Sequence, residues 1–152
     1  MINSMYKKHS IKNLRGVTTL MEDTLIILKP DAIKRKFVGT IIQRIEAKGF
    51  ELKDIKMIQL NKKICEEHYA HLKEKPFFED ILNFMTSSKV IVAIISGENV
   101  IEAIRRLIGN TNPLEASPGT IRGDFAFSTR HNIIHASDSI QAAKEEIKRF
   151  FN

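Results

Sequence analysis

The chain contains few of the residues that would cross-link it covalently or hold it in a membrane. It has one cysteine, Cys65, which excludes an internal disulfide and provides no cluster of thiol ligands for a metal. No apolar run approaches the ~20 residues that a helix needs to cross a bilayer. The region after residue 20 also lacks internal repeats, linkers and low-complexity segments. These absences exclude a disulfide scaffold, a thiolate metal centre and a membrane-spanning helix, and we expect a cytoplasmic protein.

The 152 residues are enough for one domain with a real core and too few for two ordinary domains. Hydrophobic residues make up 43% and charged residues 28%, which is typical of a globular protein. The formal net charge is +6, but residues 1–20 carry +4 of it, because they hold four basic residues and no acid. The remaining +2 is weak evidence for nucleic-acid binding, which we do not expect.

Residues 1–20 differ in composition from the rest, and we expect a basic, disordered N-terminal extension followed by a domain over residues 21–152. Met21 could itself be a start codon, so an over-extended gene start is an equally good interpretation. A targeting segment fits less well, because the extension has one arginine and lacks a clean apolar region.

Hydrophobic periodicity predicts alternating strands and helices along the domain. Strands are expected at 24–29, 50–60, 90–95 and in the run that ends at His135, and helices near 38–45, 64–72, 76–85, 101–108 and 140–150. The alternation in 50–60 slips near Asp54, which is typical of a half-exposed strand at a sheet edge. Asn99 with Glu102, and Asp138 with Gln141, have the spacing of helix caps.

This order of elements predicts an α+β fold. It fits a ferredoxin-like βαββαβ arrangement, in which helices and extra helices pack on a four-stranded antiparallel sheet. Residues 110–130 lack this hydrophobic periodicity, which predicts a long ordered loop with one short helical turn. A loop of this length in a compact domain is usually functional.

One stretch, NIIHASDS at 132–139, places a histidine at the end of a short apolar strand and just before a helix. A helix start favours anions such as phosphate. Groups that bind phosphate occur elsewhere in the chain, namely Lys29, Arg105, Arg122 and Asn132. Taken singly, each of these is more often an ordinary surface residue, and a lone histidine more often fills a strand end.

Taken with their neighbours, these residues form six ordered motifs. They are LKPD at 28–31, HY at 68–69, KPFF at 75–78, GNTNP at 109–113, PGTIRGDF at 118–125 and NIIHASDS at 132–139. Their order and spacing resemble those of the nucleoside diphosphate kinases, from about residue 22 to residue 151. Ala136 departs from the family, which often has glycine there, but no departure touches a matched functional position.

The resemblance implies a role for each matched residue. His135 matches the nucleophile that takes the γ-phosphate from one triphosphate and gives it to a diphosphate, in a ping-pong phosphohistidine mechanism. Lys29, Arg105, Thr111, Arg122 and Asn132 match phosphate and ribose binders, and Phe77 matches the aromatic under the base. Tyr69, Ser137 and Glu146 match supporting residues around the histidine.

The family's chemistry agrees with general principles. A neutral histidine can form a covalent intermediate, and phosphoryl transfer needs positioning and charge neutralisation more than acid–base work. Mg²⁺ is expected on the nucleotide phosphates, without a dedicated set of protein ligands. The resemblance also implies a homo-oligomer, either a tetramer or a hexamer, and leaves the preferred nucleotide open.

Several alternatives stay open on the sequence alone. Phe77 could be a core residue beside Phe78, Tyr69 could serve packing only, and Glu146 could be a solvated glutamate. His68 and His71 are interpreted as a solvated helix face rather than a metal pair. A catalytically silent relative that binds nucleotides or nucleic acid is the second functional hypothesis, although every matched catalytic position is present.

Overall fold

The computed structural model describes residues 10–12 and 18–151. The expectation of a disordered extension therefore falls mostly outside the described residues. Its described part contains the strand β1 (Ser10–Lys12), which pairs antiparallel with the first residues of β2 (Thr18–Leu28). The other elements are α1 (Pro30–Lys34), α2 (Val38–Ala47), β3 (Glu51–Gln59), α3 (Lys62–His68), η1 (Ala70–Leu72), α4 (Phe78–Thr86), β4 (Lys89–Glu98), α5 (Val100–Ile108), α6 (Ile121–Phe125), β5 (Ile134–Ala136) and α7 (Ile140–Phe151).

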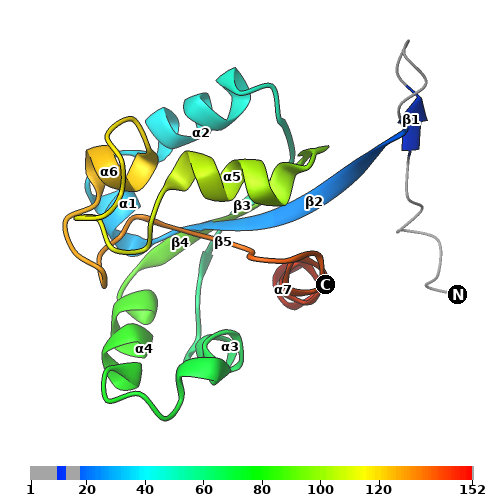
Figure 1. The fold of residues 1–152 in the computed structure, drawn as a ribbon. Coiled ribbons are helices and arrows are strands. Elements are labelled where there is room, and N and C mark those ends of the chain that lie inside the picture. Colours follow the sequence, from blue (N-terminus) through cyan, green and yellow to red (C-terminus); the bar gives the residue numbers. More distant parts are fainter. Residues whose placement is uncertain (1–9, 13–17, 152) are drawn as a thin grey trace, which may run out of the picture.

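The central sheet has the order β5-β2-β4-β3, and every neighbouring pair in it is antiparallel. The first and third strands of the ferredoxin-like unit, β2 and β4, are therefore central, and the two other strands form the edges. Helices cover both faces of the sheet (Figure 1). The predicted α+β class and ferredoxin-like arrangement are confirmed.

Two hydrophobic cores lie on opposite faces of the sheet, because successive side chains of a strand point to opposite sides. Ile26 and Leu28 of β2 face the core formed with α1, α2, α5 and α6. Leu25 and Ile27 face the core formed with α3, α4 and the end of α7. All four side chains are fully buried, which explains why the sequence of this strand is an unbroken apolar run.

Strand β3 has the predicted character of an exposed edge strand. It pairs only with β4 among the described strands, and its register shifts between Leu52 and Asp54, where the sequence pattern slips. Ile55 and Met57 remain exposed on it. The strand β2 is longer than predicted, because Met21, Glu22 and Asp23 continue the ladder with β4 and the residues before them pair with β1.

Both predicted helix caps are wrong. Asn99 precedes α5 with a left-handed backbone (φ 50°), and its side chain makes no capping hydrogen bond. Before α7, the hydroxyl of Ser139 and not the carboxylate of Asp138 accepts a hydrogen bond from the backbone N–H of Ala142, at 3.1 Å. Asp138 is exposed, and its carboxylate is not used as the cap of α7. None of the helices in the described part of the chain is both long and apolar enough to cross a membrane.

Candidate active site

His135 lies on the edge strand β5, directly opposite Ile27 of β2. Residues opposite each other in a ladder project to the same face of a sheet. Its neighbours Ile134 and Ala136 point into the core beneath α5, so the imidazole points to the other face, toward α3, α4 and α7. The alternation of one short strand thus decides that the histidine enters the cleft on this face, where 23% of its side chain remains exposed.

The ring of His135 is held from α7. Its Nε2 lies 3.1 Å from Oε1 of Glu146, and Oε2 of the same carboxylate accepts a hydrogen bond of 2.5 Å from the hydroxyl of Ser137. Ser137 is fully buried and is itself anchored to the backbone of Leu25. This chain of contacts orients the imidazole and makes Nε2 the nitrogen that carries the proton, which leaves Nδ1 with a free lone pair. With 13% of its side chain exposed and these two partners, Glu146 is not a solvated glutamate.

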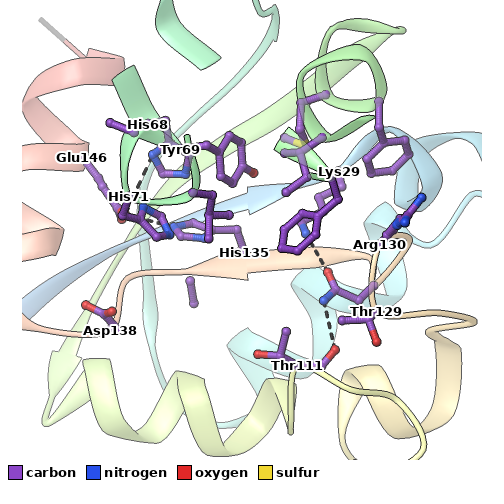
Figure 2. A pocket seen from close by; sticks show the side chains of 18 of the residues that line it. Lys29, His68, Tyr69, His71, Thr111, Thr129, Arg130, His135, Asp138 and Glu146 are labelled. Carbon is purple, nitrogen blue, oxygen red and sulfur yellow. Dashed lines mark hydrogen bonds and ion pairs between the residues drawn. The ribbon is translucent and has the colours of Figure 1, made fainter. Parts of the chain in front are cut away.

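His68 packs edge-on against His135, with ring centroids 4.6 Å apart (Figure 2). It is only 7% exposed, so the interpretation of a solvated helix face is wrong for this residue. Burial, followed by the positive field of His135 and Arg149, lowers the pKa of His68 to about 2. A neutral ring agrees with the contact to α7, where Nη1 of Arg149 donates to Nδ1 of His68 at 3.3 Å.

A chain of polar groups runs across the cleft in front of the histidine. Nζ of Lys29 donates to Oδ1 of Asn132 at 2.6 Å, and Nδ2 of Asn132 donates to the carbonyl of Thr111 at 3.1 Å (Figure 2). Lys29 follows directly after β2, and burial lowers its pKa to about 8. The nearby charge of Arg122 lowers the pKa further, while Asp31 opposes both effects.

Arg122, on the short helix α6, is buried and bound mainly by backbone carbonyl groups. Its guanidinium donates to the carbonyls of Ile134, Gly109 and Asn132, at 2.7, 3.1 and 3.3 Å. Gly109 ends α5 with φ +84°, a conformation that suits glycine, and a Cβ there would collide with Thr120. Burial and the neighbouring Arg105 lower the pKa of Arg122 to about 10, so it keeps its charge at neutral pH.

The backbone just before β5 is strained. Ile133 is β-branched and has φ 74°, which is a genuine outlier for such a residue. Two contacts hold it there: its N–H donates to Oδ2 of Asp31 at 3.1 Å, and its carbonyl accepts from the N–H of Lys29 at 2.9 Å. Strain of this kind persists only where the surroundings fix it, so Lys29 and the first turn of α1 position the strand that carries the histidine.

The remaining predicted residues lie around the same space. Phe77 precedes α4 and is half-buried beside the cleft, whereas its neighbour Phe78 belongs to the core. Tyr69 is buried at 7% exposure, and burial raises the pKa of its hydroxyl, which has no hydrogen-bond partner among the described residues. Arg105 is exposed on α5, with Nη1 3.5 Å from the carbonyl of Ala136.

Together these residues line one cleft with a volume of about 1050 Å³, which is enough for a nucleotide. It contains nine of the ten predicted site residues: Lys29, Tyr69, Phe77, Arg105, Thr111, Arg122, Asn132, His135 and Glu146. Ser137 lies beneath the cleft and reaches it through Glu146. The predicted residues therefore bring to the cleft an oriented imidazole, three basic side chains and two aromatic rings.

Comparison with known proteins gives a consistent result. The family model described as nucleoside diphosphate kinase matches residues 22–152. The chain belongs to the nucleoside diphosphate kinase family. It is 54% identical to a nucleoside diphosphate kinase of Methanocaldococcus jannaschii over 132 residues, which are 87% of this chain and 94% of the relative. It is 50% identical to the nucleoside diphosphate kinase of Acetivibrio thermocellus over 86% of this chain and 96% of that relative.

Solved structures agree. The apo crystal structure of the nucleoside diphosphate kinase from Encephalitozoon cuniculi has a TM-score of 0.84 and 45% identity, over 86% of this chain and 88% of that chain. The resemblance predicted from the six motifs is thereby confirmed, and so is the enzyme class of phosphotransferase.

Sequence reasoning missed several residues of this nucleoside diphosphate kinase cleft. His68 had a usable signal, because it shares a helix face with Ile64 and Leu72, which are partly buried. Arg149, Asp80 and Arg130 also line the cleft, and their local sequence gave no reason to select them. Their contacts join segments far apart in the chain, and periodicity carries no information about such pairs.

Proposed function

We propose that this chain is an active nucleoside diphosphate kinase that transfers the γ-phosphate of ATP, or of another triphosphate, to a nucleoside diphosphate through a phosphohistidine on His135. The observation that carries the proposal is the 3.1 Å contact between Nε2 of His135 and Glu146. It leaves Nδ1 as the nucleophilic nitrogen of a half-buried ring that lines the same cleft as Lys29 and Arg122. Formation of CTP from ATP and CDP, measured by chromatography, tests it.

The proposed reaction consists of two displacements at phosphorus. The lone pair on Nδ1 attacks the γ-phosphorus, the bond to the β–γ bridging oxygen breaks, and the diphosphate leaves with that electron pair. The phosphorylated ring keeps the proton on Nε2 and gains positive character, which the carboxylate of Glu146 stabilises. In the second displacement, an oxygen of the acceptor's β-phosphate attacks the phosphorus, and the electron pair of the P–N bond returns to Nδ1.

The basic residues fit the charge that the reaction develops. Lys29 and Arg105 offer donors toward the cleft, and Arg122 keeps one N–H of Nη2 beyond its hydrogen bonds to protein groups in the described part of the chain. Fixed donors that surround a transferring phosphoryl group stabilise its transition state without reorganisation.

The donor set also fits Mg²⁺ carried on the nucleotide phosphates. The phosphate-binding residues are cationic or amide groups, so they suit phosphate oxygens and not a bare metal ion. Asp138 is an exposed carboxylate at the cleft, close to the start of α7 in Figure 2, and would supply an oxygen ligand beside the phosphates. When bound, Mg²⁺ neutralises phosphate charge.

Replacement of Phe77 by alanine is expected to weaken nucleotide binding by roughly 1–3 kcal/mol, the range for loss of a stacking aromatic. Every base has a π-face, so the loss should be similar for ADP and CDP. Calorimetric titration of both diphosphates measures it. Unchanged affinity for both would assign Phe77 to packing alone.

Nucleotide binding is expected to take up a proton above pH 8. The pKa of Lys29 is lowered to about 8 in the free protein, and a bound phosphate favours the ammonium form and raises it. ADP affinity should therefore fall by up to about tenfold per pH unit above pH 8, and this group should have no effect well below it. Calorimetry at pH 8.5 in buffers of different ionisation enthalpy measures the uptake, and Lys29→Arg should abolish it. Absence of uptake in the unmodified protein would contradict the pKa assignment.

We also propose a homo-oligomer. Its support is the exposed edge strand β3, which carries the exposed Ile55 and Met57 and offers an edge for two-fold pairing. Leu114 and Phe127 are 94% and 86% exposed on the long loop, which suits a further interface. The proposed assembly is a tetramer or a hexamer. The cytoplasmic location stays a prediction.

A further inference from the structure

Two contacts join opposite walls of the cleft. One wall is α4, and the other is the segment 126–133 that leads into β5. Nη1 of Arg130 forms an ion pair with Oδ2 of Asp80 at 2.9 Å. The rings of Phe84 and His131 meet edge to face, with centroids 4.5 Å apart. All four residues line the cleft, so these contacts bridge it from one side to the other.

The bridge lies away from the reacting histidine. In Figure 2, Thr129 and Arg130 stand at one end of the cleft, and His68, Glu146 and His135 stand toward the other, with Lys29 between them. Asp80 is the third residue of α4, and Phe77 is the residue just before the helix. The carbonyl of Phe77 accepts the first hydrogen bond of α4, from the N–H of Ile81 at 3.1 Å, so Phe77 and Asp80 both belong to the first turn of the helix. The ion pair therefore lies at the same end of α4 as the aromatic ring proposed to stack on the base.

The ion pair is weak enough to open. The side chains of Arg130 and Asp80 are 61% and 58% exposed, so water and salt screen the attraction. A base stacked on Phe77 would exclude water from one side of the pair, and a less polar surrounding strengthens the attraction between opposite charges. The pair is therefore easy to break while the cleft is empty and harder to break once a base lies behind it.

We propose that Arg130 and Asp80 form a clasp that closes over the base-binding end of the cleft and slows the release of bound nucleotide. The inference rests on the proposed function, because it assigns that end to the base. The clasp acts on nucleotides that carry a base and leaves phosphate binding around Lys29 and Arg122 unchanged. Its two residues affect the residence time of the nucleotide and do not touch the reacting atoms.

Release of a fluorescent ADP labelled on its ribose, measured by stopped flow, tests the clasp. Asp80→Asn and Arg130→Gln should each speed release by about two- to fivefold, the range expected from the energy of an exposed pair. The double variant should release no faster than either single variant, because each change breaks the same contact. Exchange of the charges, Asp80→Arg with Arg130→Asp, should restore slow release.

A matched control lies next to the clasp. Glu79 neighbours Asp80 on α4 and forms an exposed ion pair with Lys62 at 3.3 Å, and neither residue lines the cleft. Glu79→Gln should leave the release rate unchanged. High salt also weakens the contacts between the basic residues and the phosphates, so it should speed release from both proteins. The effect should be larger in the unmodified protein than in Asp80→Asn, because only the unmodified protein has the ion pair to screen.

Three results would overturn the clasp: unchanged release in both single variants, additive effects in the double variant, or equal weakening of ribose 5-diphosphate, which has no base. Failure of the proposed function is distinguishable from these results. It would appear as absence of CTP formation in the unmodified protein, whereas the clasp is tested on ADP binding alone.

Discussion

His135→Ala is expected to abolish phosphoryl transfer, by about 10⁶-fold, the order observed when a covalent nucleophile is removed. The reason is geometric: the imidazole is held by Glu146 at 3.1 Å and opens onto the basic cleft through its other nitrogen. His135 lies on an edge strand with part of its side chain exposed, so its loss should not unfold the domain. CTP formation from ATP and CDP measures activity, and circular dichroism reports the fold.

A matched histidine variant separates chemistry from general damage. His71 is exposed and has no role in the proposed mechanism, so His71→Ala should keep its activity. Substantial transfer by a well-folded His135→Ala protein would mean that the nucleophile is another residue.

Glu146→Ala is expected to slow phosphorylation of His135 by about 10- to 100-fold, the order seen when a group that orients a functional histidine is lost. The carboxylate connects Nε2 of His135 to the hydroxyl of Ser137. Without it the imidazole can rotate, and either ring nitrogen can carry the proton. Because the carboxylate makes no contact with Lys29, Arg122 or Asn132 in the structure, nucleotide affinity should change little. Rapid-mixing measurement of phosphohistidine formation gives the rate directly.

Glu145→Ala is the matched control, because Glu145 is exposed on the same helix and accepts a hydrogen bond from Gln141. An unchanged phosphorylation rate in Glu146→Ala would assign Glu146 to packing or solubility. Equal losses in both variants would point to an effect of helix α7 as a whole.

The fold was largely predictable because its signals are local. The unbroken apolar runs of β2 and β4 indicate strands covered on both faces, and the slip near Asp54 marks the irregular edge strand β3. The helix caps were predicted wrongly because several polar residues stand near each helix start. Ser139, and not Asp138, has the backbone geometry to cap α7, and the sequence pattern does not distinguish them.

The candidate site was predictable where its residues stand in motifs, and it was missed where a role depends on a distant partner. Glu146 lies within one turn of the buried face of α7. From this spacing the sequence predicted that its side chain lies near the strand of His135, and the structure has it there. The burial of His68 beneath His135 depends on the packing of α3 against α7. The ion pair between Asp80 and Arg130 joins residues 50 positions apart, and neither residue is unusual in its local sequence.

The most direct test of the account is the chemical form of the phosphoenzyme. The unmodified protein is incubated with [γ-³²P]ATP without an acceptor, the labelled residue is mapped, and the nitrogen that carries phosphate is identified by ³¹P nuclear magnetic resonance. The account predicts a base-stable, acid-labile phosphate on Nδ1 of His135, discharged by CDP to form CTP, because Nε2 is bound to Glu146. Label on a hydroxyl or on another histidine, or transfer without any labelled intermediate, would contradict it.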